Sequence, residues 1–362
     1  MYNEENTPII DIPELKPPVT AISHGDTNGI GYEIIIKALA DPRIFDFITP
    51  VVYGNSKLAS YHRKTLALQN FNFNLVKNVE SANPKRPNII NINEDEIKID
   101  LGKETPISGE MAYLSLEKAI IDLKAGKADI LVTAPVQKNA IQALHPEFRG
   151  HTEYLQEKFK AKDILMIMAS NTMKIALATT HEPISTVAGL IKKELLIKKI
   201  YLFNQSLIQD FNISIPKIAV LGLNPHAGDN GMFGNEDIEE ICPAIDELNK
   251  QGVAAFGPFP ADGFFGSLKH QEYDGVFAMF HDQALIPFKT LCFEDGVNFT
   301  AGLPIVRTSP AHGTAFDIVG QDQASGQPFK SALLLASEIF HNRERYAKIH
   351  ENPLKTNIKH LH

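Results

Sequence analysis

Three histidines each follow an apolar, strand-like segment of the chain. They are His181 in ALATTHEPIS, His226 in VLGLNPHAGDNG and His281 in VFAMFHDQALIP. Because the carboxyl ends of parallel strands share one edge of a sheet, the three rings can converge there although they are far apart in sequence. Three imidazoles suit a catalytic divalent ion such as zinc and leave one position open for a substrate oxygen. Each histidine taken singly could equally be a hydrogen-bonded structural residue, and only the repeated pattern of strand then histidine favours a shared metal site.

Two aspartates stand in comparable positions. Asp262 lies in GPFPADGFF, and Asp282 directly follows His281. Either carboxylate could orient an imidazole, complete a metal shell or accept a proton. A turn or helix-cap role explains an isolated aspartate in a Gly/Pro-rich loop at least as well. The residues alone therefore leave both roles open.

Basic residues around Asn298 could bind a small anion. Lys289 and Arg307 bracket Asn298 in a stretch with few other cations. An arginine grips phosphate or carboxylate through two parallel hydrogen bonds, and a lysine supplies a compact charge. His151 and Thr152 in RGHTEYL are predicted to begin a helix, whose free N–H groups also favour anions. The alternatives are solvated surface charges for the first set and a helix cap by Thr152 for the second.

The segments that must position these residues alternate between predicted strands and predicted helices, as in βαβ units. This alternation predicts an α/β fold around a largely parallel sheet. The predicted strands are 19–23, 50–53, 130–133, 164–169, 174–179, 217–222 and 275–280. The predicted helices, with apolar residues at helical spacing, are 111–123, 192–207, 236–248 and 331–340. Loops rich in Gly, Pro and His are expected directly after strands, at 24–31, 224–234, 257–263 and 307–313. The first of these loops lacks the full dinucleotide fingerprint, which argues against a classical Rossmann site.

Length and composition set the wider limits. A chain of 362 residues with 44% hydrophobic and 22% charged residues is expected to fold as about two globular domains. The net charge of −8 argues against nucleic acid or an anionic membrane as the main partner. Only two cysteines, Cys242 and Cys292, fit a reducing, cytoplasmic setting. No apolar run reaches the roughly 18 residues that span a bilayer, and the first 18 residues lack the pattern of a signal peptide.

The ordered motifs together resemble the 4-hydroxythreonine-4-phosphate dehydrogenases of pyridoxal phosphate biosynthesis. The resemblance extends over residues 20–339 and rests on GDTNGIGYE, GHTE, TTHEP, LNPHAGDNG, GPFPAD, FHDQALIPFK, GVNFTAGLPIVRTS and HGTAFDI. It implies an isocitrate/isopropylmalate dehydrogenase-like fold, with two α/β/α domains and a cleft between them instead of a classical Rossmann domain. The first domain would comprise residues 1–135 and 305–362, and the second would comprise 136–304.

The same resemblance assigns roles to individual residues. The implied ligands of a divalent metal (Zn, Mg or Co) are His181, His226 and His281. The implied contacts to a phosphorylated hydroxy amino acid are His151, Thr152, Lys289, Asn298 and Arg307, with Asp262 and Lys289 as catalytic groups. The implied site for NAD, or NADP in its place, is His312, Gly313, Thr314 and Asp317. A homodimer with active sites at the interface is also implied, with the third histidine reaching the metal from the neighbouring subunit.

The implied reaction is oxidation of 4-phosphooxy-L-threonine by NAD and loss of carbon dioxide, which yields 3-amino-2-oxopropyl phosphate. A paralogous dehydrogenase of 4-phospho-threonate or 4-phospho-erythronate would use the same scaffold. From other classes, a metal-dependent phosphoryl hydrolase or a non-catalytic binder of a phosphorylated ligand could use the same residues. Reduction of NAD separates the dehydrogenases from both of these, and release of inorganic phosphate identifies a hydrolase.

Overall fold

The sheet is the organising element of the structure, a computed structural model that describes residues 16–68, 70–93 and 97–351. Within these residues twelve strands form one sheet in the order β3-β4-β2-β1-β5-β12-β11-β6-β7-β10-β8-β9. The strands are β1 (Val19–Ser23), β2 (Thr49–Gly54), β3 (Asn74–Leu75), β4 (Asn88–Asn91), β5 (Ile130–Thr133), β6 (Leu165–Ala169), β7 (Lys174–Leu177), β8 (Lys217–Leu221), β9 (Ala254–Phe259), β10 (Gly275–Ala278), β11 (Val297–Ala301) and β12 (Val306–Pro310).

Most neighbouring strands run parallel, as predicted. The exceptions lie at the centre of the sheet, where β11 is antiparallel to β6 and β12, and β6 is antiparallel to β7. The α/β fold class is therefore confirmed, and the strand order is not that of a classical Rossmann domain. The division into 1–135 plus 305–362 and 136–304 stays a prediction.

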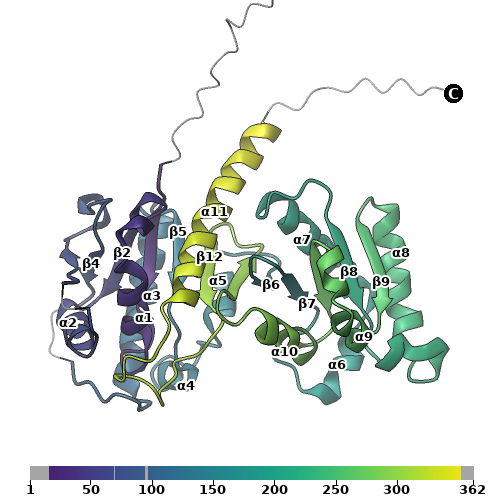
Figure 1. Cartoon of the computed structure of the whole chain (residues 1–362), viewed down its shortest axis with the longest axis horizontal. Coiled ribbons are helices and arrows are strands. Elements are labelled where there is room, and N and C mark those ends of the chain that lie inside the picture. Colours follow the sequence, from purple (N-terminus) through teal and green to yellow (C-terminus); the bar gives the residue numbers. More distant parts are fainter. Residues whose placement is uncertain (1–15, 69, 94–96, 352–362) are drawn as a thin grey trace, which may run out of the picture.

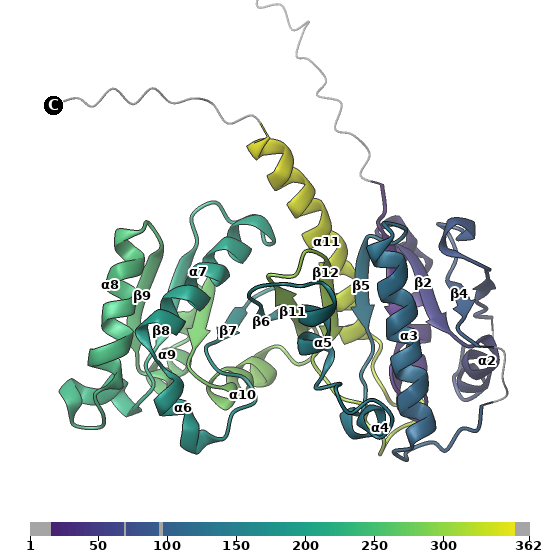
Figure 2. The same ribbon diagram turned by 180° about the vertical axis from the view of Figure 1, so that it is seen from behind.

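Helices cover both faces of the sheet (Figures 1 and 2). They are α1 (Gly31–Leu39), α2 (Ser56–Lys64), α3 (Pro106–Lys124), α4 (Lys138–Gln142), α5 (His151–Lys158), α6 (Ile184–Leu190), α7 (Lys193–Gln209), α8 (Cys242–Lys250), α9 (Ala261–Gly266), α10 (His281–Leu291) and α11 (Gln327–His350). One core joins α1, α2, α7, α8 and α11 to one face, and two smaller cores join α3 and α5, and α9 and α10, to the other face. In the part of the chain that the structure describes, no helix could cross a membrane.

Alternation along the strands explains the two covered faces. In β1, Ile22 belongs to the core with α1 and α11, whereas its neighbour Ala21 belongs to the core with α3. Both side chains are fully buried, so the strand is apolar on both faces, as expected of a covered parallel sheet. Local signals fix the helix ends: the side chain of Thr105 accepts a hydrogen bond from the Ser108 N–H, and Pro106 occupies the first turn of α3.

All seven predicted strands are present: 19–23 and 130–133 have the predicted ends, and the ends of the others differ by at most two residues. Two predicted loops were wrong in part. Residues 257–259 complete β9 and 261–263 begin α9, while 307–310 form most of β12, an internal strand between β5 and β11. Pro310 made this segment look like a loop in the sequence, because proline is normally excluded from the interior of a sheet except at strand ends. The predicted helix 331–340 is the middle of the longer α11, and 236–248 divides into a π-helical turn (Asp237–Ile241) followed by α8.

The N-terminal segment that was predicted to lack a signal-peptide pattern falls largely outside the described residues, since the structure describes nothing before residue 16. Cys242 and Cys292 are both free cysteines. The loops that follow β5, β7, β10 and β12 all approach the middle of the sheet, and their first residues carry the side chains of the candidate site.

Candidate active site

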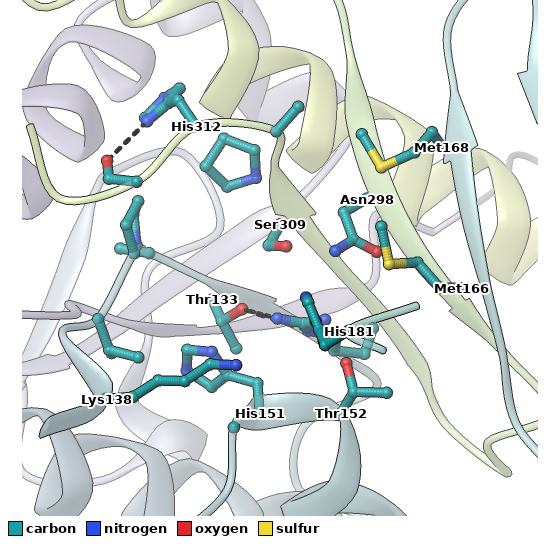
Figure 3. Close-up of a pocket in the computed structure, with 18 of the residues that line it drawn as sticks. Thr133, Lys138, His151, Thr152, Met166, Met168, His181, Asn298, Ser309 and His312 are labelled. Atoms are coloured by element: carbon teal, nitrogen blue, oxygen red, sulfur yellow. Dashed lines mark hydrogen bonds between the residues drawn. The ribbon is translucent and has the colours of Figure 1, made fainter. Parts of the chain in front are cut away.

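A cavity of about 250 Å³ lies where β5, β12, β11 and β6 meet the starts of α5 and α10 (Figure 3). Eight of the residues that the sequence singled out line it: His151, Thr152, His181, His281, Asn298, Arg307, His312 and Gly313. Segments far apart in the sequence thus meet at one place, as the strand-then-histidine pattern predicts for the edge of a sheet.

Arg307 supplies a buried positive charge to this cavity. It lies on β12 with 3% of its surface exposed. Its Nη2 and Nε donate hydrogen bonds to Oγ1 of Thr133 on β5 (2.7 and 3.2 Å), and its Nη1 donates to Oγ1 of Thr300 (3.2 Å). Burial lowers the pKa of Arg307 to about 10, so the group stays charged at neutral pH. Among the described residues it forms no ion pair, and the surface role considered for it is wrong.

A buried cation without an ion-pair partner is costly unless a bound anion neutralises it, and Glu153, which lines the same cavity, acts on Arg307 without pairing with it. His151 and Thr152 open α5 beside this charge, with Gly150 as the N-cap residue. Thr152 therefore lies inside the helix and does not cap it. Burial, followed by the charges of Arg307 and Lys138, holds the pKa of His151 well below its usual value, so its imidazole is neutral. The arrangement fits an anion bound between the guanidinium and the free N–H groups of α5.

Two of the three predicted metal-binding histidines lie side by side at the cavity. The ring centroids of His181 and His281 are 5.9 Å apart. Burial and the charge of Lys138 lower the pKa of His181, which favours the neutral, metal-binding form of the ring. Nδ1 of His281 lies 2.7 Å from Oδ1 of Asp282, so this carboxylate orients the imidazole and leaves Nε2 free.

His226 does not line this cavity. It belongs to the short helical segment Pro225–Gly231, where residues 226–230 all have positive φ angles, and it is exposed next to Phe233. Among the described residues no group of three His, Cys, Asp or Glu side chains could hold a metal ion. A single chain therefore brings the first and third histidines together and leaves the second apart, whereas the third was expected to come from a neighbouring subunit.

Four further predicted residues do not line the cavity: Asp262, Lys289, Thr314 and Asp317. Asp262 is exposed near the start of α9, and Lys289 is exposed near the end of α10. The charge of Lys289 nevertheless reaches His312, where it adds to the burial that lowers the pKa of that ring. The predicted roles of these four residues stay predictions.

Two buried polar atoms of the cavity have no hydrogen-bond partner within the described part of the chain. They are Oδ1 of Asn298 and Nε2 of His312. Buried polar groups are nearly always paired, and exceptions concentrate at sites that bind a ligand. Because both atoms belong to residues that line the cavity, they fit hydrogen-bonding groups of a bound molecule.

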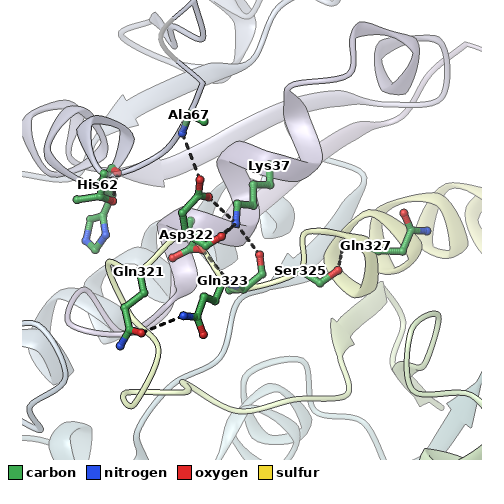
Figure 4. Close-up of polar contacts among 11 residues, drawn as sticks. Lys37, His62, Ala67, Gln321, Asp322, Gln323, Ser325 and Gln327 are labelled. Carbon is green, nitrogen blue, oxygen red and sulfur yellow. Dashed lines mark hydrogen bonds and ion pairs between the residues drawn. The ribbon is translucent and has the colours of Figure 1, made fainter.

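The loop that carries His312 is anchored at its far end (Figure 4). Nζ of Lys37 on α1 lies 2.8 Å from Asp322 and 2.8 Å from the buried Glu33, and it also donates to the carbonyl of Ala324 at 2.7 Å. At the near end, the N–H of Ile30 donates to the carbonyl of Thr314. The loop after β12 is therefore held against the start of α1.

Comparison with known proteins decides the family. A sequence profile described as "Pyridoxal phosphate biosynthetic protein PdxA" matches residues 46–336. The chain belongs to the PdxA family. It is 46% identical over 335 residues to a 4-hydroxythreonine-4-phosphate dehydrogenase from Bacteroides thetaiotaomicron, covering 92% of each chain. The crystal structure of a 4-hydroxythreonine-4-phosphate dehydrogenase from Klebsiella pneumoniae is similar with a TM-score of 0.76 and 32% identity, over 91% of this chain and 99% of that one.

A further relative bears on the choice between paralogues. A protein from Oceanobacillus iheyensis, provisionally named a D-threonate 4-phosphate dehydrogenase, is 38% identical over 327 residues, covering 90% of this chain and 98% of that protein. Membership of the PdxA family thus agrees with the resemblance found in the motifs.

The structure adds cavity residues that the sequence did not reveal in this PdxA-family chain. Lys138, Glu153, Thr133 and Ser309 all line the cavity. Their position relative to a strand end could have revealed two of them. Thr133 is the last residue of β5, and Lys138 is the first residue of the next helix, α4. A lysine just beyond the carboxyl end of a strand belongs to the same class of site as the three histidines.

Proposed function

We propose that this protein is an NAD-dependent dehydrogenase that oxidises the secondary alcohol of 4-phosphooxy-L-threonine, with loss of carbon dioxide to give 3-amino-2-oxopropyl phosphate. The observation that carries the proposal is the buried, unpaired charge of Arg307 in the same cavity as the His181–His281 pair. The charge of Arg307 suits a phosphate, and the histidine pair suits chemistry at a hydroxyl group. Membership of the PdxA family supports the same reaction.

The phosphate group is assigned to Arg307. The guanidinium donates hydrogen bonds to the hydroxyl groups of Thr133 and Thr300, and these bonds fix its orientation. His151, Thr152 and Asn298 border the same part of the cavity and supply further polar contacts. Binding at this end fixes the distance between the phosphate and the carbon that is oxidised, which lowers the entropic cost of reaching the transition state.

His181 and His281 fit two of the three ligands of a divalent metal ion. Both rings face the cavity, and Asp282 holds His281 with one nitrogen free. When bound, such an ion supplies Lewis-acid chemistry that lowers the pKa of an alcohol and stabilises an enolate. In a homodimer with shared sites, the exposed His226 of a second copy is the third ligand in this proposal, because one chain does not bring it to the cavity.

The nicotinamide cofactor, NAD or NADP, is assigned to the loop 312–317. His312 and Gly313 line the cavity, and the unpartnered Nε2 of His312 is available to a ligand. NAD supplies the hydride acceptor, while the chain positions the alcohol carbon against it. Asp262 and Lys289 lie outside the cavity of one chain, so their proposed roles, proton acceptance and substrate contact, require the dimer.

The test is incubation of the purified protein with 4-phosphooxy-L-threonine, NAD and a divalent ion, followed by NADH absorbance and detection of carbon dioxide. Reduction of NAD that a chelator abolishes supports the proposal. Release of inorganic phosphate without NADH would identify a hydrolase instead. Stabilisation by the substrate with no turnover of any kind would identify a binding protein.

A second candidate substrate is D-threonate 4-phosphate, because the Oceanobacillus iheyensis relative carries that name. It has the same phosphate end and a hydroxyl in place of the amino group. The ratio of kcat/KM for the two compounds decides between them, since this ratio measures discrimination in the transition state.

A further inference from the structure

Lys138 is a second cation at the active-site cavity, and the dehydrogenase reaction has not yet used it. It is the first residue of α4 and lines the cavity together with His151, Glu153 and His181. Figure 3 shows its side chain extending into the cavity beside His151. Among the described residues Lys138 takes part in no ion pair or side-chain hydrogen bond, so its charge is available to a ligand.

The end of the Lys138 side chain passes close to a glycine. Gly150 has a φ of 150°, and a β-carbon there would come within 3.3 Å of Cε and 3.4 Å of Nζ of Lys138. The same β-carbon would meet Oε2 of Glu153 at 2.9 Å. The lysine therefore packs over the backbone that begins α5, next to the proposed phosphate site, and any larger residue at 150 would displace it.

Two cations line the cavity. Arg307 and Lys138 both lower the pKa of His151, with the larger share from Arg307. Lys138 also lines the cavity together with His181 and His281, the pair at which the alcohol is oxidised. Lys138 therefore faces the same cavity as the phosphate end, at Arg307 and His151, and as the histidine pair.

The proposed substrate carries two anionic groups, a phosphate at one end and a carboxylate at the other, with the reacting carbon between them. The buried guanidinium takes the phosphate, and Lys138 is the other lysine or arginine among the described residues that line the cavity, so it is placed to take the carboxylate. We propose that Lys138 binds the substrate carboxylate and makes the enzyme specific for phosphorylated hydroxy acids over the corresponding phosphorylated alcohols. This inference rests on the proposed function.

An ion pair between lysine and carboxylate beside the histidine pair has two consequences. It offsets the cost of bringing the carboxylate into the same cavity as the phosphate of the same molecule, and it fixes the orientation of the bond that breaks when carbon dioxide leaves. A phosphorylated alcohol without the carboxylate can still use Arg307, but it gains nothing from Lys138. The specificity therefore appears as a difference in affinity between two ligands that share the phosphate end.

The test compares two ligands by isothermal titration calorimetry: 4-phosphooxy-L-threonine and 3-amino-2-hydroxypropyl phosphate, which lacks only the carboxylate. The wild-type protein is expected to bind the first more tightly by about 10- to 100-fold, as a charged hydrogen bond provides. Lys138→Met should abolish that difference by weakening the first ligand alone, and Lys138→Arg should retain most of it. Arg307→Lys should weaken both ligands alike.

A matched control is Lys85→Met, which removes an exposed lysine that pairs with Asp46 and should leave both affinities unchanged. The inference is overturned if Lys138→Met weakens both ligands equally, which would place the lysine at the phosphate, or if it weakens neither. Equal affinity of the wild-type protein for the two ligands, or failure to bind either, also overturns it. Wild-type protein that shows the difference in affinity but does not reduce NAD would refute the proposed function while leaving the role of Lys138 intact.

Discussion

The guanidinium of Arg307 on β12 is held by the hydroxyl of Thr133 on the neighbouring strand β5, with hydrogen bonds of 2.7 and 3.2 Å. The two strands are parallel, and Thr133 lies at the carboxyl end of its strand. One hydroxyl thus orients a charge that is buried in the sheet and faces the cavity. The pair defines the end of the site at which an anion binds.

Replacing Arg307 by lysine keeps the charge but loses the planar donor set. We expect KM for the phosphorylated substrate to rise about 10- to 100-fold with a smaller change in kcat, because lysine cannot reproduce the bidentate contact. Thr133→Val should raise KM by a smaller factor, since it removes only the group that orients Arg307. Steady-state kinetics check both, with the exposed Arg86→Lys as control. Unchanged KM in Arg307→Lys would contradict the assignment of the phosphate.

A shared metal site can be tested by mixing inactive variants. His181→Ala and His226→Ala should each lose bound metal and nearly all activity, because each removes one of three ligands. If the two histidines of one site come from different subunits, mixed dimers regain one intact site, and random mixing restores about a quarter of the wild-type sites. Activity and metal content are measured after the variants are unfolded and refolded together. A mixture as inactive as its components would show that the two histidines do not complement each other across subunits.

The sequence predicted much of this site because strand ends and motif residues carry local signals. His181 and His281 meet at one cavity, as the rule that ligands bind beyond strand ends predicts, and His151 lies there at the start of a helix, as its motif predicts. Arg307 was harder, because burial of an arginine depends on β12 lying inside the sheet, which no local pattern around Pro310 shows. The position of His226 depends on five residues with positive φ angles, and Lys138 is positioned by α4, whose backbone at Ala140 packs against Gly109 of α3. These are tertiary relationships that neither spacing nor composition encodes.

Two buried histidines near the first strand should make stability fall in mild acid. His24 and His62 stack on either side of Tyr32, with centroids 5.0 and 5.3 Å away, and burial lowers the pKa of each ring to about 4. Because the unfolded chain binds protons near pH 6.5, their contribution to stability is complete above that pH and is lost as pH falls toward 4. For one such ring the loss between pH 7 and pH 5 is about 2 kcal/mol.

The variant that tests this is His62→Gln, whose amide can still donate to the carbonyl of Thr27 as Nε2 of His62 does. Urea unfolding at pH 7 and pH 5 should show a smaller acid-induced loss in the variant than in the wild-type protein, by about the contribution of one ring. The exposed His350→Gln is the control and should leave the pH dependence unchanged. An equal loss in wild type and His62→Gln would show that His62 is not titrating in the folded state as described.

The anchor between Lys37 and Asp322 should affect the cofactor more than the phosphorylated substrate. Asp322 has a positive φ angle of 56° and pairs with Lys37 at 2.8 Å, which holds the loop that begins at His312 against α1. Asp322→Asn keeps the shape of the side chain but removes the charge. We expect KM for NAD to rise about 3- to 10-fold, with the free energy of unfolding lowered by less than about 1 kcal/mol, because the pair is partly exposed. KM for the substrate should stay constant, since Arg307 lies on a strand that the anchor does not touch.

Asp46→Asn, which removes a carboxylate from an exposed pair with Lys85, is the matched control. Equal increases in both KM values would mean that the anchor supports the whole cavity and not the cofactor loop alone.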